Sequence, residues 1–512
     1  MLQEGKPVIL LAVLEYGELP ELLRVAEVAS AAVRGEAVFM FTKRGYRRLA
    51  QDTAAVIAAG FLWMDALGNI HAEAALPVAE PLPAAAADTT LAESLPPRLA
   101  DRGALRRLYV APLLSLLASA SIAQAGAFAV RSLARDIANC MRDMRRFRRR
   151  YAELHAILLA NRPRMLIVGQ DSLGGELSFL LQAAGRLRIP RLITPFAMFS
   201  LQETADFARA NSAHHVASSA VNRAVATTFP HWVLRHQDRD LLRLPGYRAL
   251  ALEMTGLVHA LPWSPLSEPV EAITASSEVA AEVLIAMGID RKALHVIGSP
   301  IQDRLAGMLA ERTALRQQLC AEYGLHAEKP LLVCGWPVNM FAWLAGRAAV
   351  YPDYPAVANA WASKLAEVRD MHGVNVIVSV HPKTLDSEII AAQQAGLPCR
   401  RTGADDLIAA CDIFTTLNGS SITAWAIACG VPVVLFDCFH TRYTDFFKVA
   451  GCTRVDSEEA FSAALHKLCA DAGYRAAMAV LQQGDSARWG RLDGKAGDRL
   501  ANLIRQLDGA SR

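Results

Sequence analysis

The sequence lacks an excess of either charge. Its 512 residues include 53 Lys and Arg against 50 Asp and Glu, which leaves a net charge of +3. This balance does not indicate a nucleic-acid binder, whose surface is usually strongly basic. Hydrophobic residues make up 53% and charged residues 20% of the chain, so a large core can form, and the length predicts two domains.

Closely spaced cysteine pairs are also missing. The nine cysteines are scattered and none form a CxxC pair: Cys140, Cys320, Cys334, Cys399, Cys411, Cys429, Cys438, Cys452 and Cys469. Several lie within apolar runs, which favours buried thiols in a reducing compartment over a disulfide framework or a zinc site. We therefore expect a cytoplasmic protein without a bound metal or cofactor.

Two apolar stretches bear on targeting. Residues 1–18 (MLQEGKPVILLAVLEYGE) have no basic segment before the apolar run, which favours a buried strand over a signal peptide. Residues 108–130 carry no charge and are long enough to span a membrane, but Ser, Ala, Gly and Gln dilute them, and Pro112 and Gly126 interrupt them. This composition favours a helical insertion in the first domain, placed at about residues 70–160.

An arginine-rich run follows the uncharged stretch. Its members are Arg142, Arg145, Arg146, Arg148, Arg149 and Arg150. A solvated helix face is one interpretation. Peripheral contact with an anionic membrane surface, at the inner face of the membrane, is the other.

Short apolar strands alternate with helices in two series, which predicts parallel sheets. We expect an α/β protein with two facing Rossmann-like domains, 1–305 and 306–512, and a ligand in the cleft at the carboxyl ends of the strands. Residues 200–244 are expected to be mainly helical. The predicted strands are 7–14, 37–42, 164–169, 191–195, 272–276 and 294–297 in the first domain, and 330–334, 375–380, 413–416 and 433–436 in the second.

Small and hydroxyl side chains interrupt the chain between the strand at 413–416 and the next helix. The motif is Asn418-Gly419-Ser420-Ser421, with Thr423 shortly after. A helix start presents unpaired N–H groups and the positive end of its dipole, and small residues let a phosphate approach them. An ordinary helix N-cap is the alternative interpretation.

A second motif ends the β-branched strand at 375–380. It is His381-Pro382-Lys383, in which the imidazole can donate a hydrogen bond to a phosphate and the Lys adds a positive charge. Gly335, at another strand end, could add a backbone amide. A packed His beside a solvated Lys is the alternative.

Together, VHPK, NGSSIT and GVPVV in residues 330–440 resemble the nucleotide-binding domain of GT-B glycosyltransferases. The pattern is most similar to bacterial sialyltransferases and polysialyltransferases and to capsule or lipopolysaccharide (Kdo-type) transferases, which carry His-Pro and Ser-Ser/Thr motifs. The resemblance implies transfer from a CMP- or UDP-linked sugar to a glycan. His381 would then contact the donor phosphate or help the nucleotide leave, and Ser420 and Ser421 would hold the phosphate. Residues 489–496 resemble the end of this domain, where a last helix packs back across the cleft.

Non-hydrolysing UDP-sugar 2-epimerases share this domain. Residues 169–171 (GQD) and 298–300 (GSP) are similar to theirs, but those enzymes place acidic residues on the helix after the phosphate loop. Here residues 422–428 (ITAWAIA) contain no carboxylate, which favours transfer over epimerisation. A non-catalytic nucleotide-sugar binder is a third alternative.

An inverting transfer needs a base near the acceptor hydroxyl. The related sialyltransferases take it from an acidic-acidic-Gly motif, which this chain lacks; it has residues 15–18 (EYGE) after the first strand. The candidates are Glu15 and Glu18, followed by Asp171 and Glu176. Solvated loop carboxylates are the alternative, and a retaining enzyme would need no such base.

Overall fold

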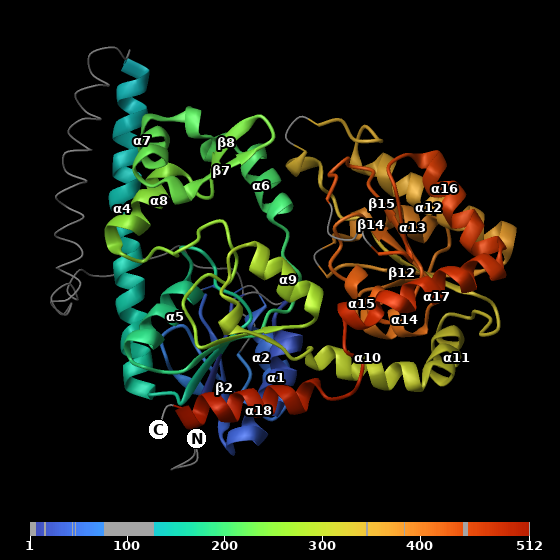
Figure 1. The fold of residues 1–512 in the computed structure, drawn as a ribbon, viewed down its shortest axis with the longest axis horizontal. Coiled ribbons are helices and arrows are strands. Elements are labelled where there is room, and N and C mark those ends of the chain that lie inside the picture. The colour runs from blue at the N-terminus through green and yellow to red at the C-terminus, as the bar shows by residue number, and fades with distance from the viewer. Residues whose placement is uncertain are drawn as a thin grey trace.

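The computed structural model describes residues 7–14, 17–43, 45–46, 48–75, 127–344, 347–382, 384–443 and 449–510, with the backbone alone for 127–130 and 343. These residues form two α/β units, drawn in blue to yellow and in orange to red in Figure 1.

The N-terminal unit is built on an eight-stranded sheet with the strand order β10-β9-β6-β5-β1-β2-β3-β4. All neighbours pair in parallel except β3 and β4. Because helices cover both faces, the central strands are continuously apolar, as in the VILLAV of β1. The strands are β1 (Val8–Val13), β2 (Glu36–Phe41), β3 (Leu62–Met64), β4 (Ile70–His71), β5 (Met165–Val168), β6 (Arg191–Ile193), β9 (Ala272–Ala275) and β10 (Leu294–Val296).

Helices pack on both faces of this sheet, and a small helical cap with a hairpin stands at its carboxyl edge (Figure 1). The hairpin pairs β7 (Val233–His236) with β8 (Arg239–Leu242) and adds two short strands to a segment, 200–244, that is otherwise mainly helical as expected. The helices are α1 (Leu19–Val33), α2 (Leu49–Ala58), α4 (Ala127–Asn161), α5 (Glu176–Arg186), α6 (Leu201–Ala210), α7 (Ala220–Thr228), α8 (Gly246–Thr255), α9 (Glu278–Ala286) and α10 (Pro300–Ala310).

The C-terminal unit has a six-stranded parallel sheet with the strand order β13-β12-β11-β14-β15-β16. This order is doubly wound, and its switch point lies between β11 and β14. The strands are β11 (Leu331–Gly335), β12 (Asn375–Ser379), β13 (Cys399–Arg400), β14 (Ile413–Leu417), β15 (Val433–Phe436) and β16 (Cys452–Val455). The helices are α11 (Arg312–Glu322), α12 (Tyr354–His372), α13 (Ile390–Gln394), α14 (Ala404–Ala410), α15 (Thr423–Ala428), α16 (Glu458–Ala470), α17 (Ala472–Trp489) and α18 (Ala496–Ala510).

The last helix returns to the N-terminal unit. In Figure 1 α18 runs beneath α1, away from the other red and orange elements. Leu500, Leu503 and Ile504 are buried in the core formed by one face of β1 and β2, and Asp508 pairs with Arg164. The end of the chain therefore belongs to the first unit in space, and the predicted boundary at 305 falls within α10.

The α/β architecture of two Rossmann-like domains is confirmed. Residues 76–126, which include most of the expected helical insertion and most of the uncharged stretch 108–130, lie outside the described residues. Residues 127–161 of that insertion form the single helix α4. Over the part of the chain that the structure describes, no helix combines the length and apolarity that crossing a membrane requires.

Candidate functional site

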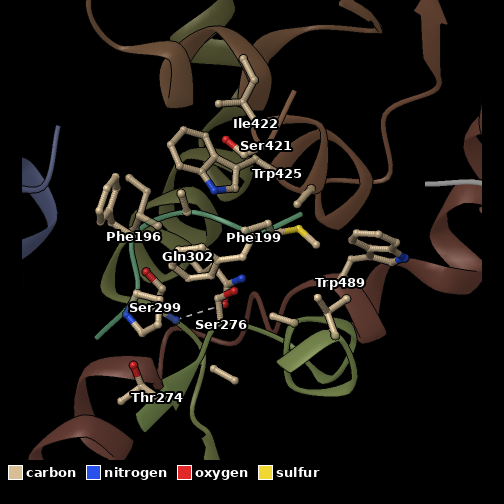
Figure 2. Close-up of a pocket in the computed structure, with 18 of the residues that line it drawn as sticks. Phe196, Phe199, Thr274, Ser276, Ser299, Gln302, Ser421, Ile422, Trp425 and Trp489 are labelled. Carbon is tan, nitrogen blue, oxygen red and sulfur yellow. Dashed lines mark hydrogen bonds between the residues drawn. The ribbon is translucent and has the colours of Figure 1, made fainter. Parts of the chain in front are cut away.

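A cavity lies between the two units (Figure 2). Its empty space, part of which opens to solvent, amounts to about 760 Å³. The N-terminal unit contributes the loops after β6 and β9 and the start of α10, and the C-terminal unit contributes α15 and Trp489 at the end of α17. The cavity is thus placed at the carboxyl ends of strands in both sheets, where doubly wound sheets bind ligands.

The walls of this cavity are aromatic, and its polar groups are neutral. Among the described residues that line it, none is an Asp, Glu, His, Lys or Arg. Flat apolar walls with a few hydroxyl and amide groups suit an uncharged ring system held by hydrogen bonds. The aromatic members are Phe196, Phe199, Trp425 and Trp489, and the polar members are Thr274, Ser276, Ser299, Gln302 and Ser421.

Ser299 is fixed by the start of α10. It forms a capping box with Gln302, whose Oε1 accepts a hydrogen bond from the Ser299 amide at 3.3 Å. Its hydroxyl donates to the carboxylate of Glu21 on α1. Burial raises the pKa of Glu21 against the opposing effect of this hydrogen bond. The polar floor of the cavity is therefore anchored to the N-terminal core.

The predicted phosphate loop reaches the cavity through Ser421, which is exposed and lines it. Ser420 is half-buried and is not among the lining residues. Among the described residues, the amides of Gly419, Ser421 and Ile422 form no backbone hydrogen bond. Thr423 is fully buried, and its hydroxyl has no partner, so the structure keeps it away from the cavity surface.

Gly419 is required by its surroundings. Its φ is +93°, and a Cβ at this position would lie 2.5 Å from Cδ2 of Tyr443. The preceding Asn418 donates from Nδ2 to the carbonyl oxygen of Tyr443 at 3.1 Å. The loop after β14 is therefore tied to the loop after β15.

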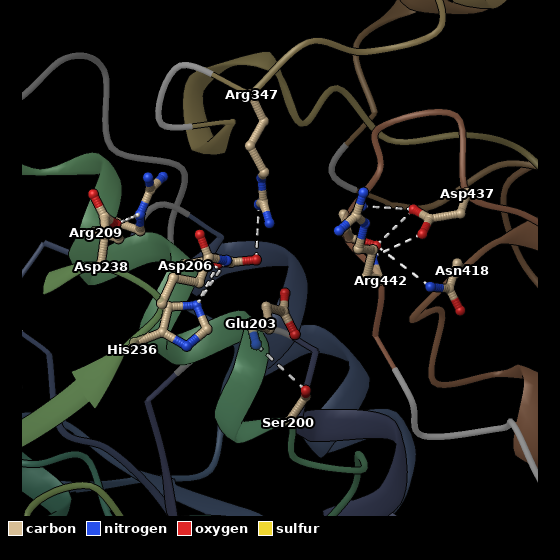
Figure 3. Close-up of polar contacts among 12 residues, drawn as sticks. Ser200, Glu203, Asp206, Arg209, His236, Asp238, Arg347, Asn418, Asp437 and Arg442 are labelled. Atoms are coloured by element: carbon tan, nitrogen blue, oxygen red, sulfur yellow. Dashed lines mark hydrogen bonds and ion pairs between the residues drawn. The ribbon is translucent and has the colours of Figure 1, made fainter. Parts of the chain in front are cut away.

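Asp437 organises that second loop (Figure 3). Its carboxylate accepts hydrogen bonds from the amides of Thr441 at 2.8 Å and Arg442 at 2.7 Å, and from the guanidinium of Arg454 at 3.3 Å. These bonds hold Arg442 in the left-handed region, at φ 57°, with its side chain exposed.

The His-Pro motif lies on the same edge of the sheet but outside the cavity lining. His381 and Pro382 are exposed after β12, and Lys383 lies outside the described residues. Because β11 stands between β12 and β14, the two predicted motifs follow strands that are not neighbours.

The end of β11 serves packing. Gly335 is buried, and a Cβ there would lie 2.7 Å from Oγ1 of Thr416 on β14. The next residue, Trp336, is buried and donates from Nε1 to the carbonyl oxygen of Glu388 at 2.9 Å. Close strand packing therefore accounts for this glycine without a ligand.

An ion pair joins the two units beside the cavity. Nη2 of Arg347, in the loop after β11, lies 2.8 Å from Oδ2 of Asp206 on α6, and the other oxygen of Asp206 lies 2.8 Å from Nε2 of His236 (Figure 3). Asp206 is 2% exposed, so this contact is largely shielded from solvent.

Glu18 lies at the switch point between β1 and β5. Its carboxylate accepts hydrogen bonds from the amide of Leu14 at 3.2 Å and from the side chain of Gln170, and it is fully buried. A Cβ added at Gly169 would lie 3.6 Å from Cγ of Glu18 and 3.3 Å from Cδ1 of Phe196, a residue of the cavity wall, so the two side chains flank this glycine. Glu18 is therefore close to the cavity but covered, whereas Glu15 lies outside the described residues.

Asp171 and Glu176, the further candidates for the base, hold other parts of the first domain in place in this structure. Asp171 accepts hydrogen bonds from the amides of Leu266 at 2.7 Å and Glu268 at 2.8 Å, and its carboxylate lies 3.6 Å from Nδ1 of His259. Burial raises the pKa of Asp171 to about 6. Glu176, at the start of α5, is paired with Arg150 at 2.9 Å.

Several cavity residues were not predicted from the sequence as site residues. Phe196, Phe199 and Gln302 follow strands or begin a helix in the first domain, where only the general rule about carboxyl ends could have indicated them. Trp425 had a clearer signal, since it lies four residues after Ser421 and so returns to the same face of the helix turn. No group of three or more acidic, His or Cys side chains within the described parts of the chain could hold a metal ion.

Neither a scan against protein-family models nor a search of curated protein sequences found a match. A search of solved structures matched a "putative UDP-N-acetylglucosamine 2-epimerase" from Listeria monocytogenes, with a TM-score of 0.50 and 11% identity over 98% of this chain and 96% of that chain. It also matched a UDP-GlcNAc 2-epimerase from Neisseria meningitidis bound to UDP-GlcNAc, with a TM-score of 0.49 and 11% identity over 98% of this chain and 99% of that chain. A third match is the calicheamicin glycosyltransferase CalG4, with a TM-score of 0.46 and 12% identity over 99% of both chains.

The Listeria match, which spans nearly the whole length of both chains, bears on the fold alone at this identity. The finer resemblance to sialyltransferases and Kdo-type transferases stays a prediction. This chain has the GT-B fold, with two Rossmann-like domains that enclose a cavity between the carboxyl ends of their strands.

Proposed function

We propose that the chain is a glycosyltransferase that binds a nucleotide sugar in the interdomain cavity and transfers the sugar to a glycan or other acceptor. The observation that carries this proposal is the composition of the cavity, which has aromatic walls and neutral polar groups. Ser421 lies on one side of it, and the amides of Gly419, Ser421 and Ile422 form no backbone hydrogen bond among the described residues. Aromatic walls suit a nucleobase, and amide and hydroxyl donors suit a phosphate.

The proposed donor is a CMP-linked acidic sugar ahead of a UDP-linked one. The exposed Arg442, held in place by Asp437, could pair with a carboxylate on such a sugar. His381 and Lys383 would approach the phosphate from the end of β12. Loss of nucleotide binding on His381→Ala, with an unchanged unfolding transition, is the expected result, and unchanged binding and activity would remove His381 from the site.

Glu18 is the proposed base for an inverting transfer, with Glu15 as the alternative. The support is its position at the switch point, one side chain away from the cavity wall at Phe196. Closure of the units around the acceptor would have to expose the carboxylate, because it is buried in this structure.

The second candidate is a UDP-sugar 2-epimerase, which the name of the Listeria match suggests. Epimerisation at carbon needs acid–base groups at the sugar. Neither α15 nor the described lining of the cavity offers a titratable side chain, which favours transfer. A non-catalytic nucleotide-sugar binder is the third candidate.

Incubation of the full chain with CMP- and UDP-sugars, with and without acceptor glycans, separates the three candidates. Acceptor-dependent release of nucleotide supports transfer. Formation of an isomeric UDP-sugar without acceptor would replace the proposal by epimerisation. Binding of nucleotide without consumption of any donor would leave only the binder.

A further inference from the structure

A second hollow lies on the N-terminal unit, away from the residues that line the interdomain cavity. It is bounded by α4, by the starts of α5 and α8, and by the residues that follow β1 and β2. Five cationic side chains line it: Lys43, Arg146, Arg149, Arg150 and Arg248. We call these residues the basic pocket.

Three of the five cations already have acidic partners. The carboxylates that line the pocket, Glu153 and Glu176, are both engaged in these pairs, so they do not offset the remaining positive charge. The ion pairs are Arg146–Asp143 at 3.2 Å, Arg149–Glu153 at 3.1 Å, Arg150–Glu153 at 3.0 Å and Arg150–Glu176 at 2.9 Å.

The other two cations have no carboxylate within ion-pair distance among the described residues. The guanidinium of Arg248 lies over the ring of Phe147, 5.8 Å from its centre, and donates to the carbonyl oxygen of Gly174 at 3.3 Å. Its Nε is buried and has no hydrogen-bond partner in the part of the chain that the structure describes. Burial and the neighbouring charge of Arg146 lower the pKa of Arg248. The charge of Asp143 opposes this shift without forming an ion pair with Arg248. A buried donor and an only partly balanced charge both cost free energy that an anion would recover.

The start of α5 also lines the pocket, through Gly174, Gly175 and Glu176. The N-cap is Gly175, which has no side chain to accept from them, and Gly174 before it has a φ of +62°. An uncapped helix start of this length leaves N–H groups and the positive end of the dipole for an anion. This feature adds to the cationic side chains and does not replace them.

We propose that the basic pocket binds a phosphate or diphosphate group, with Arg248 and Lys43 as its principal cations. A planar guanidinium can hold two phosphate oxygens, and the Lys and the helix amides can take others. Leu14, whose amide donates to Glu18, also lines the pocket, so the bound group would lie beside the end of β1. The inference does not depend on which reaction the interdomain cavity carries out.

The test is calorimetric titration of the full chain with inorganic pyrophosphate at low salt. We compare the wild type with Arg248→Ala, with Lys43→Ala and with Lys292→Ala, an exposed lysine elsewhere on the N-terminal unit. Each pocket variant should weaken binding by about tenfold or more, and Lys292→Ala should leave it unchanged. Because Lys43 is exposed, Lys43→Ala is not expected to disturb folding. This variant therefore tests the pocket even if Arg248→Ala does not fold.

A parallel arm uses vesicles of phosphatidylglycerol and of phosphatidylcholine to distinguish a lipid headgroup from a free phosphate. Vesicle binding that pyrophosphate displaces and that both pocket variants lose would assign the site to a headgroup. Pyrophosphate binding without vesicle binding would assign it to a free phosphate compound. The inference is overturned if pyrophosphate does not bind, or if both pocket variants bind it as tightly as the wild type.

Vesicle binding that is lost only on replacing the exposed Arg142 and Arg145 would indicate a general surface contact of α4 and would exclude a lipid headgroup as the occupant of the basic pocket. Nucleotide titrations of the same variants keep this test separate from the proposed function. Lys43→Ala should retain the nucleotide affinity of the wild type, since Lys43 does not line the interdomain cavity.

Discussion

The carboxyl edges of the two sheets differ in chemistry although both sheets are doubly wound. At the N-terminal edge the charged side chains are buried and paired, as in Glu18 with Gln170 and Asp171 with His259. At the C-terminal edge Ser421 lines the cavity, and among the described residues its amide and that of Gly419 form no backbone hydrogen bond. Both edges reach the cavity. The acidic groups near it at the N-terminal edge are buried and paired, whereas the C-terminal edge presents neutral donors to it and keeps Asp437, Arg442 and His381 outside its lining.

This difference follows from how each edge is held. The loops of the N-terminal edge are long, and buried carboxylates fix them by accepting backbone hydrogen bonds, as Asp171 does from Leu266 and Glu268. The loop at 418–421 at the C-terminal edge is short and packs against Tyr443, whereas the neighbouring loop after β15 is fixed by the buried carboxylate of Asp437. A loop held by packing leaves its amides free for a ligand.

The sharpest test of the comparison is Glu18→Gln. If Glu18, at the N-terminal edge, is the base, its replacement should slow acceptor-dependent nucleotide release by about 10²- to 10⁴-fold, the usual contribution of a general base. Initial rates at saturating donor measure it. Glu27→Gln, on the exposed face of α1, is the matched control and should keep the wild-type rate. If the Glu18→Gln variant keeps the full rate but is less stable, Glu18 has a structural role, like Asp171, and is not the base.

The second test is the pH dependence of stability. Burial raises the pKa of Asp171 from 3.8 to about 6, so the folded protein keeps this proton at pH values where the unfolded chain has lost it. Its contribution to the free energy of unfolding is therefore complete below pH 3.8 and is lost as the pH rises to about 6. Since one pKa unit corresponds to about 1.4 kcal/mol, the loss is about 3 kcal/mol.

His259 extends this decline to higher pH. Burial alone would lower the pKa of His259, but its hydrogen bond to Glu268 and the charge of Asp171 outweigh burial and raise it. Denaturant unfolding of the wild type and of Asp171→Asn at intervals between pH 4 and pH 7 provides the measurement. The wild-type advantage over the variant should shrink as the pH rises, and a difference that stays constant would contradict the raised pKa.

The third test addresses the edge held by packing. Gly419→Ala combines an unfavourable φ of +93° with a contact of 2.5 Å to Tyr443, and should cost about 2 kcal/mol of stability as well as nucleotide affinity. Gly484→Ala on α17, where an added Cβ meets no atom within 4 Å, should instead stabilise the protein slightly. Equal effects of the two substitutions would show that the loop is not fixed in this way.

The smallest effect is expected at the cavity wall. Trp425→Ala should weaken nucleotide binding by about tenfold, because base stacking on an aromatic side chain is worth about 1–3 kcal/mol. Phe207→Ala, on α6 and 45% exposed, is the control and should leave the affinity unchanged. An unaltered affinity in the Trp425 variant would place the nucleotide elsewhere.

Buried central strands could be predicted from the sequence, and of the edge strands only β10 was predicted, at 294–297. The strands predicted at 375–380 and 433–436 match β12 and β15 within one residue, because continuous β-branched runs are typical of strands covered on both faces. The edge strands β13 and β16 were missed, since their half-buried residues do not form such runs. The hairpin β7–β8 was missed because its short strands contain charged and polar residues.

The candidate site was predicted only in part. Ser421 lines the cavity, and Asn418 and Gly419 form the loop before it, as the motif indicated. Thr423 is buried and Gly335 serves strand packing, so neither faces the cavity. The aromatic wall draws on residues from Phe196 to Trp489, and no local pattern could relate positions so far apart in the chain.

By itself the sequence determined the two-domain α/β fold and the loop that opens toward the cavity, because apolar periodicity and small residues act locally. Only the tertiary structure decided that the final helix packs on the first domain, that acidic candidates are buried as anchors, and that five cations meet in one pocket. These features arise from contacts between segments distant in sequence, and a side chain's burial and charge balance depend on which neighbours the folded chain brings to it.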